Sequence, residues 1–187
     1  MPIVNVEAVE HAFTDALLAD AATWDRPNLM GLVEQRDDGR IELLTFDIPG
    51  PTWTYDGGKP HQVLLALAQM LASSPAELNQ DQRETLHRDT ENTVGVWFYN
   101  DAWETPAGGS PDAVRRVKTA GADPPIGEDL DHIESKAINA VLFGHIHRAV
   151  RLRRGNTNTD VFPHVDGPVA YPLAMACLAI EQRRTRA

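Results

Sequence analysis

The sequence predicts a single α+β domain over residues 1–187, in the order α-β-β-α-β-β-β-α. Three observations favour it. Apolar residues recur at helical spacing in three segments, two pairs of apolar runs are each separated by a short turn, and no repeat divides a chain that has the length of one domain. Strands joined by short turns pair antiparallel, so we expect an antiparallel sheet of about five strands, built from two hairpins and a middle strand. The three main helices should pack on one face of it or at its ends.

The helices are expected at residues 5–20, 60–72 and 169–183. Each segment repeats apolar residues every three or four positions, the spacing of one helix face. Asn5 is a suitable N-cap for the first helix. Pro60 opens the second helix in its first turn, where a missing N–H costs little.

The first hairpin is predicted from strands at about 29–35 and 40–47, which flank the dipeptide Asp38-Gly39. An Asp-Gly step tolerates the positive φ angles of a tight turn. The middle strand begins at residues 94–99, which are rich in β-branched and aromatic side chains, and it extends towards Trp103.

The second hairpin is expected over residues 134–154, with its turn near Phe143-Gly144-His145. Before it lies a stretch rich in proline and glycine, at about 104–131. Such a composition predicts a long loop, and we expect it to be the most mobile part of the chain.

Composition limits the classes of function. The net charge of −10 and the pI near 5.0 argue against broad nucleic-acid binding, because phosphate attraction needs surplus lysine and arginine. No apolar run approaches the roughly 18 residues that span a bilayer, and residues 1–7 lack the pattern of a signal peptide. The single cysteine, Cys177, lies in an apolar segment and is expected to be a small core residue. We therefore expect a cytoplasmic protein without a membrane partner.

A basic stretch stands out in this acidic chain. Between residues 136 and 158 there are five basic residues and no aspartate or glutamate: Lys136, Arg148, Arg151, Arg153 and Arg154. Because side chains alternate along a strand, His147, Arg151 and Arg153 should project from one face. That face predicts a binding surface for a carboxylate-rich or phosphate-bearing partner. The alternative is a solvated face that the protein's own acidic residues neutralise.

A second candidate contact lies in the loop before the second helix. Trp53 and Tyr55 form an aromatic pair there. Exposed, the pair would be a contact patch of the kind that dominates protein interfaces. Core packing is the alternative for both side chains.

The run Gly144-His145-Ile146-His147 follows the apolar residues 140–143 and resembles the last metal-binding block of the calcineurin-like metallophosphoesterases. The resemblance implies a two-metal centre that activates water against phosphate. The family's other blocks, an Asp-X-His, a Gly-Asp and a Gly-Asn-His, are absent upstream of residue 144. A simpler hypothesis is a divalent transition-metal site in which His145 and His147 share one strand face. Its further ligands would come from a small set of nearby groups: Asp129, Asp131, His132 and His164.

Three stretches together resemble small uncharacterised proteins of actinobacteria and of the bacteriophages that infect them. They are residues 23–29 (Thr-Trp-Asp-Arg-Pro-Asn-Leu), residues 100–103 (Asn-Asp-Ala-Trp) and the hairpin from Glu134 to Gly155. The hairpin turn departs from the pattern, since Gly144-His145 replaces an Asp-X-Asp-Gly. The resemblance implies an α+β architecture and a source, and it carries no activity.

These observations favour a non-catalytic protein-interaction domain that binds another protein through the basic strand face. No catalytic residue and no cofactor is expected. One alternative is a metal-dependent phosphoesterase or hydrolase that uses the Gly-His-Ile-His segment. Another is an acidic mimic of DNA that acts as an inhibitor, although the acidic residues are scattered along the chain. Self-association of the chain also remains open.

Overall fold

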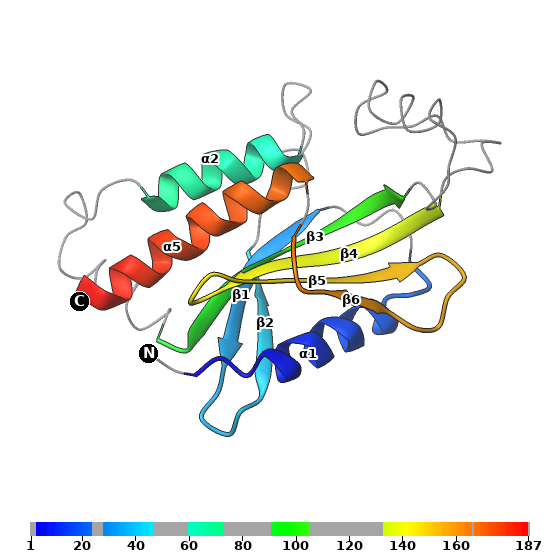
Figure 1. Cartoon of the computed structure of the whole chain (residues 1–187), viewed down its shortest axis with the longest axis horizontal. Helices are drawn as coiled ribbons and strands as arrows, with labels where there is room; N and C mark the ends of the chain where they lie inside the picture. Colours follow the sequence, from blue (N-terminus) through cyan, green and yellow to red (C-terminus); the bar gives the residue numbers. More distant parts are fainter. Residues whose placement is uncertain are drawn as a thin grey trace.

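The computed structural model describes residues 3–23, 28–46, 60–72, 91–104, 133–165 and 167–186. It confirms an α+β fold with one antiparallel sheet, whose strands lie in the order β2-β1-β3-β4-β5-β6 (Figure 1). The strands are β1 (Leu29–Gln35), β2 (Ile41–Thr45), β3 (Thr93–Glu104), β4 (Ile133–Leu142), β5 (Ile146–Arg153) and β6 (Asp160–Phe162). The helices are α1 (Val6–Ala19), α2 (Pro60–Ala72) and α5 (Ala170–Arg186), and a short 3-10 turn, η4 (Gly167–Val169), leads into α5.

The sheet has one strand more than the sequence predicted. Strand β6 has three residues and pairs with the middle of β5, from Ala149–Phe162 to Arg151–Asp160. A three-residue strand is too short for its alternation to be recognised in a sequence. The loop predicted at 104–131 begins at the last residue of β3, and the rest of it lies outside the described residues.

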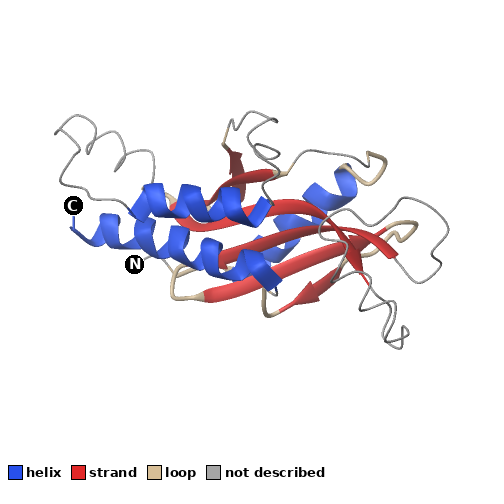
Figure 2. Ribbon diagram, turned by 90° about the horizontal axis from the view of Figure 1, so that it is seen from above, coloured by secondary structure: helices blue, strands red, loops and turns tan. Residues whose placement is uncertain are grey.

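Helices cover both faces of the sheet, whereas the sequence suggested one face or the ends. Helices α2 and α5 lie side by side on one face, and α1 lies on the opposite face (Figures 1 and 2). We name these the α5 face and the α1 face. The central strand β3 explains the arrangement, since its apolar run buries Val96 and Phe98 on the α5 face and Trp97 and Tyr99 on the α1 face. A strand buried on both sides needs a helix layer on each.

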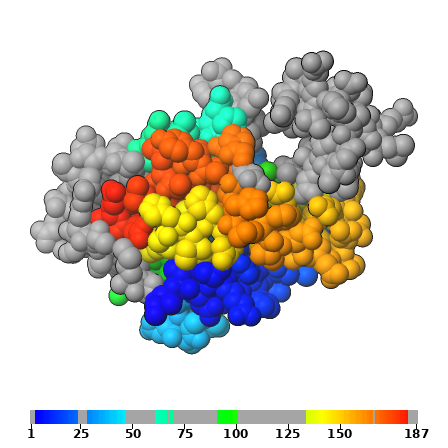
Figure 3. Space-filling model, in the orientation of Figure 1, coloured from blue at the N-terminus to red at the C-terminus, as the bar shows by residue number. Residues whose placement is uncertain are grey.

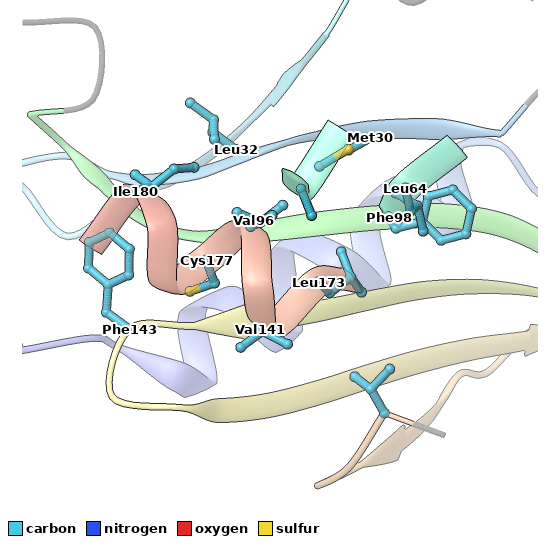
Figure 4. Packing of buried hydrophobic residues seen from close by; sticks show 13 residues of the cluster. Met30, Leu32, Leu64, Val96, Phe98, Val141, Phe143, Leu173, Cys177 and Ile180 are labelled. Carbon is cyan, nitrogen blue, oxygen red and sulfur yellow. The ribbon is translucent and has the colours of Figure 1, made fainter. Parts of the chain in front are cut away.

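The core on the α5 face joins α2 and α5 to the central strands. Figure 4 shows Leu173, Cys177 and Ile180 of α5 over the strand residues Val96 and Val141. Cys177 is buried, as the sequence predicted. No helix in the ranges that the structure describes is long and apolar enough to cross a membrane.

The first helix begins where the sequence predicted, and a strand side chain fixes its entry. Asn5 caps α1 by accepting a hydrogen bond from the Ala8 amide at 3.1 Å. The side chain of Gln35 in β1 accepts from the Asn5 amide at 2.8 Å and donates to the Ile3 carbonyl at 3.0 Å. These contacts attach the start of α1 to the sheet.

Candidate functional site

Strand β5 carries the predicted basic residues, and its register decides which face each of them occupies. Directly paired residues of an antiparallel sheet share a face. His147 pairs with Val141, a core residue of the α5 face, and the alternate residues Arg151 and Arg153 follow on the same face. We call His147, Arg151 and Arg153 the basic strip. The strip therefore lies on the helix-bearing α5 face.

The strip lies to one side of the helices on that face. Helix α5 packs on β3 and β4, whereas β5 and β6 form the far side of the sheet. All three side chains of the strip are half-buried, and Arg153 is 38% exposed. The side chains of Arg151 and Arg153 are therefore exposed enough to contact a partner. Their partial burial also restricts the conformations that they can adopt.

Strand β6 supplies the groups that position the two arginines. The guanidinium carbon of Arg151 lies 4.6 Å from the centre of the Phe162 ring, which is a cation–π contact. The Phe162 ring in turn packs edge-on against His164, with their centres 6.2 Å apart. Arg153 forms an ion pair with Asp160, 3.2 Å from Nη1 to Oδ2. The arginines therefore contact an aromatic ring and a carboxylate that alternate positions of β6 provide.

This support was not predicted from the sequence. Phe162 and Asp160 belong to β6, the strand missing from the prediction, so nothing linked them to Arg151 and Arg153. The sequence did carry a local signal, since Gly155 favours a turn and precedes Asp160-Val161-Phe162; in the structure its φ is +83°. A turn of this kind after a basic strand is typical of a further antiparallel strand.

Amide side chains continue the polar surface towards the centre of the sheet. Asn139 of β4 is buried and pairs directly with Ala149, and its Nδ2 donates to Asn100 Oδ1 at 3.0 Å. Asn100 stands in one cross-strand row with Ala137 and Arg151. The α5 face thus changes from apolar under the helices to polar around the basic strip.

Three other basic residues of the predicted stretch do not belong to the strip. Lys136 and Arg148 lie on the α1 face, because they alternate with the strip's positions in β4 and β5. Lys136 is completely buried, and its ammonium group donates to the carbonyls of Asp20 and Thr23 at the end of α1. Arg148 pairs with Glu10 of α1 at 2.6 Å. Arg154 follows the end of β5 and pairs with Glu134.

The position of His145, the first ligand of the predicted metal site, differs from the expected one. His145 does not share a strand face with His147, because it lies in the β4–β5 turn with φ +60°, after Gly144 at φ +77°. Its exposed side chain starts from the turn, and β5 begins one residue later. Asp131 and His132 lie outside the described residues. Among the residues that the structure does describe, no three histidine, cysteine, aspartate or glutamate side chains stand close enough to hold an ion.

The aromatic pair Trp53 and Tyr55 also lies outside the described ranges, so its predicted role as a contact patch stays a prediction.

Cys177 lies within the described residues, and its thiol is unreactive. Burial, with a smaller contribution from the nearby Glu181 carboxylate, raises the pKa of its thiol to about 12. A thiol with such a pKa carries almost no thiolate at neutral pH, so it is no nucleophile.

A shallow groove of about 480 Å³ runs between α1 and the β1–β2 hairpin. Exposed Glu7, His11 and Asp15 line its helix side, and Arg40 lines the hairpin side. Arg40 forms an ion pair with Asp38 at 2.6 Å. The groove thus carries charges of both signs.

No protein-family model, curated protein or solved structure matches this chain. A proposal for its function therefore depends on the geometry of its own residues.

Proposed function

We propose that the chain is a non-catalytic interaction domain that binds a carboxylate-rich segment of a partner protein through the basic strip. One observation carries the proposal. Arg151 and Arg153 stand two residues apart on one face of β5, and each is positioned by a side chain of β6. The proposal concerns recognition and assigns no chemical step to these residues.

Positioned arginines favour binding because less side-chain freedom is lost when a partner arrives. Fixing a long side chain in one conformation at an interface costs roughly 0.5–1.5 kcal/mol. The stacking of Arg151 on Phe162 meets part of that cost before binding. A guanidinium group stacks through its flat face, and its N–H donors lie in the plane of the group, where they match a carboxylate in pairs.

The spacing of the arginines fits an extended partner. Alternate residues of a strand lie about 6.6 Å apart, which is also the separation of alternate residues in an extended peptide. Two acidic residues at alternate positions of such a peptide could therefore meet Arg151 and Arg153 together. The Arg153–Asp160 ion pair is half-exposed, and pairs of this kind contribute about 0–1 kcal/mol. A partner carboxylate can replace it at little cost.

The acidity of the chain favours a protein partner over a nucleic acid. With a net charge of −10, the molecule as a whole repels a polyanion, and nucleic-acid affinity depends on many phosphate contacts at once. A short acidic segment needs only the local field of the strip. The predicted resemblance to actinobacterial and phage proteins suggests where the partner should be sought.

The test is a quantitative capture of proteins from an actinobacterial lysate. Four baits are compared: the wild type, Arg151→Glu, Arg153→Glu and a control, Arg40→Glu. The control makes the same charge change at an exposed arginine on the β1–β2 hairpin. Each bait is accepted only if its melting temperature and far-ultraviolet circular dichroism match a folded protein.

We expect at least one partner that the wild type and Arg40→Glu retain and that both strip variants lose tenfold or more. The partner's bound segment, mapped by protease footprinting, should contain acidic residues at alternate positions. If all four baits capture the same proteins in equal amounts, the strip is not the binding surface.

A further inference from the structure

The two contacts between the basic strip and β6 differ in their chemistry. Arg151 lies over the Phe162 ring, with 4.6 Å between the guanidinium carbon and the ring centre. A phenyl ring has no carboxylate oxygen, so Phe162 does not take the place of a partner's carboxylate. Asp160 does have such oxygens, and its Oδ2 atom lies 3.2 Å from Nη1 of Arg153. The group that contacts Arg153 is therefore of the same kind as the group that the basic strip is proposed to bind.

Both contacts run diagonally between β5 and β6. Arg151 is directly paired with Asp160, and Ala149 is directly paired with Phe162, yet the side chain of Arg151 reaches Phe162. Arg153 lies two residues beyond Arg151 and reaches back to Asp160 in the same direction. Long side chains can span such diagonal positions of an antiparallel pair. The Asp160 carboxylate thus lies on the same sheet face as both arginines, within reach of whatever binds there.

The Arg153–Asp160 ion pair lies where a partner can reach it. The side chain of Asp160 is 50% exposed and that of Arg153 is 38% exposed. Figure 3 shows the β5–β6 part of the chain, in yellow to orange, at the surface of the molecule. An ion pair between exposed side chains is weak in water, so it opens and closes readily in the free protein.

We infer that Asp160 is an internal competitor that partly blocks Arg153 in the free protein. The inference rests on the proposed function and concerns its regulation, since it states what an acidic segment must displace before it binds. Asp160 is held beside Arg153 by the β5–β6 pairing, so it is always present at a high effective concentration. The acidic segment contacts Arg153 only in molecules whose ion pair is open.

The size of the effect follows from the fraction of open molecules. The apparent dissociation constant rises by the inverse of that fraction. If an exposed ion pair is closed about two to five times as often as it is open, the apparent dissociation constant is about threefold to sixfold higher than it would be without the competitor. Asp160 therefore weakens binding and does not prevent it.

A supporting role for Asp160 predicts the opposite sign. If its carboxylate only held Arg153 in position, removal of the carboxylate would weaken the binding of an acidic segment. Removal of the Phe162 ring should do this at Arg151, because the ring restricts the arginine without competing for it. A competitor gives stronger binding when it is removed. The direction of the change in affinity thus separates the two roles.

The test is a nuclear magnetic resonance titration of the full chain with a decaglutamate peptide at low ionic strength, which gives dissociation constants. The variants are Asp160→Asn and Phe162→Leu, and the control is Asp38→Asn. Asp38 is 55% exposed and pairs with Arg40 at 2.6 Å, so the control removes the same charge from a similar ion pair on the β1–β2 hairpin. Circular dichroism verifies that each variant folds.

We expect Asp160→Asn to lower the dissociation constant about threefold to sixfold, and Asp38→Asn to leave it within about twofold of the wild type. Phe162→Leu should raise it. In an Arg153→Gln background, Asp160→Asn should change it by less than about twofold, because the competitor has lost its target.

The inference is overturned if Asp160→Asn binds decaglutamate no more tightly than the wild type. A gain that persists in the Arg153→Gln background also overturns it, since Asp160 would then act only by general charge repulsion. In both cases the wild type still binds, so the proposed function stands. If neither the wild type nor Asp160→Asn binds the peptide, the proposed function fails and the inference fails with it.

Discussion

The indole nitrogen of Trp97 lies directly over Gly31, its cross-strand partner on β1. From there it donates to two backbone carbonyls, those of Leu32 at 3.1 Å and Leu44 at 3.2 Å. One side chain of β3 thus reaches across β1 to the edge strand β2. A glycine is required beneath it, since a Cβ atom on Gly31 would overlap the Leu44 carbonyl and lie 2.8 Å from the indole nitrogen.

The first prediction concerns this pair. Gly31→Ala should lower the free energy of unfolding by about 3 kcal/mol, at the upper end of overpacking costs, because the obstructing atom belongs to the backbone. The control is Gly39→Ala, where φ is +83° but no atom lies within 4 Å, so we expect a loss of about 1 kcal/mol. Urea denaturation followed by circular dichroism measures both. Equal losses in the two variants would mean that the Leu44 carbonyl does not obstruct a side chain at position 31.

The second prediction concerns Lys136, whose ammonium group is buried beneath the end of α1. Lys136→Met should destabilise the protein by about 2–4 kcal/mol, because the carbonyls of Asp20 and Thr23 and the Asp20 carboxylate lose their cation. Amide hydrogen exchange should accelerate most in residues 17–23. Arg154→Met, which breaks an exposed pair with Glu134, should cost less than about 0.5 kcal/mol. A uniform increase in exchange over the whole chain would contradict this local role.

The third prediction concerns the contact between α1 and β5. Arg148 donates to Glu10 at 2.6 Å and to the carbonyl of the neighbouring His147 at 2.7 Å. A double-mutant cycle with Glu10→Gln and Arg148→Met should give a coupling energy of about 1 kcal/mol, because both side chains are mostly shielded from water. Raising the salt concentration to 1 M should reduce the coupling. A coupling energy of zero at low salt would show that the pair does not hold α1 on the sheet.

The fourth prediction follows from the raised pKa of Cys177. In the folded protein the thiol pKa is raised to about 12 from 9.0, so between these values the folded state keeps a proton that the unfolded state loses. This contribution to stability is complete below pH 9 and disappears as the pH rises towards 12, at about 1.4 kcal/mol per pH unit.

Alkaline denaturation of Cys177→Ala checks this slope, since the variant should lack it. Wild-type Cys177 should also react with a disulfide reagent at pH 8 only as fast as the protein opens. Rapid stoichiometric labelling of the folded protein would contradict the burial of the thiol.

Much of the fold could be predicted from the sequence because its signals are local. The helical spacing in α1 and the Asp-Gly turn between β1 and β2 each lie within a few residues of the structure that they specify. The placement of α1 opposite α5 depends on which residues of β3 and β4 face which helix, and that follows only from the strand register. Strand β6 was missed because its three residues carry no period of their own.

Only part of the candidate site could be predicted from the sequence. Alternation along β5 correctly placed Arg151 and Arg153 on one face, and the register confirms it. The separate count of basic residues over 136–158 also included Lys136 and Arg148, which point to α1, because a count of charges does not distinguish the two faces of a strand. The supporting residues Phe162 and Asp160 depend on a strand pairing that no sequence pattern revealed.

The most direct test of the proposed function is a nuclear magnetic resonance titration of the ¹⁵N-labelled protein with a decaglutamate peptide at low ionic strength. The account predicts that the largest amide shift changes fall in residues 147–153 and 160–164, and that Arg153→Glu abolishes them while Arg40→Glu preserves them. Shift changes that are absent from β5 and β6, or that persist unchanged in Arg153→Glu, would contradict it.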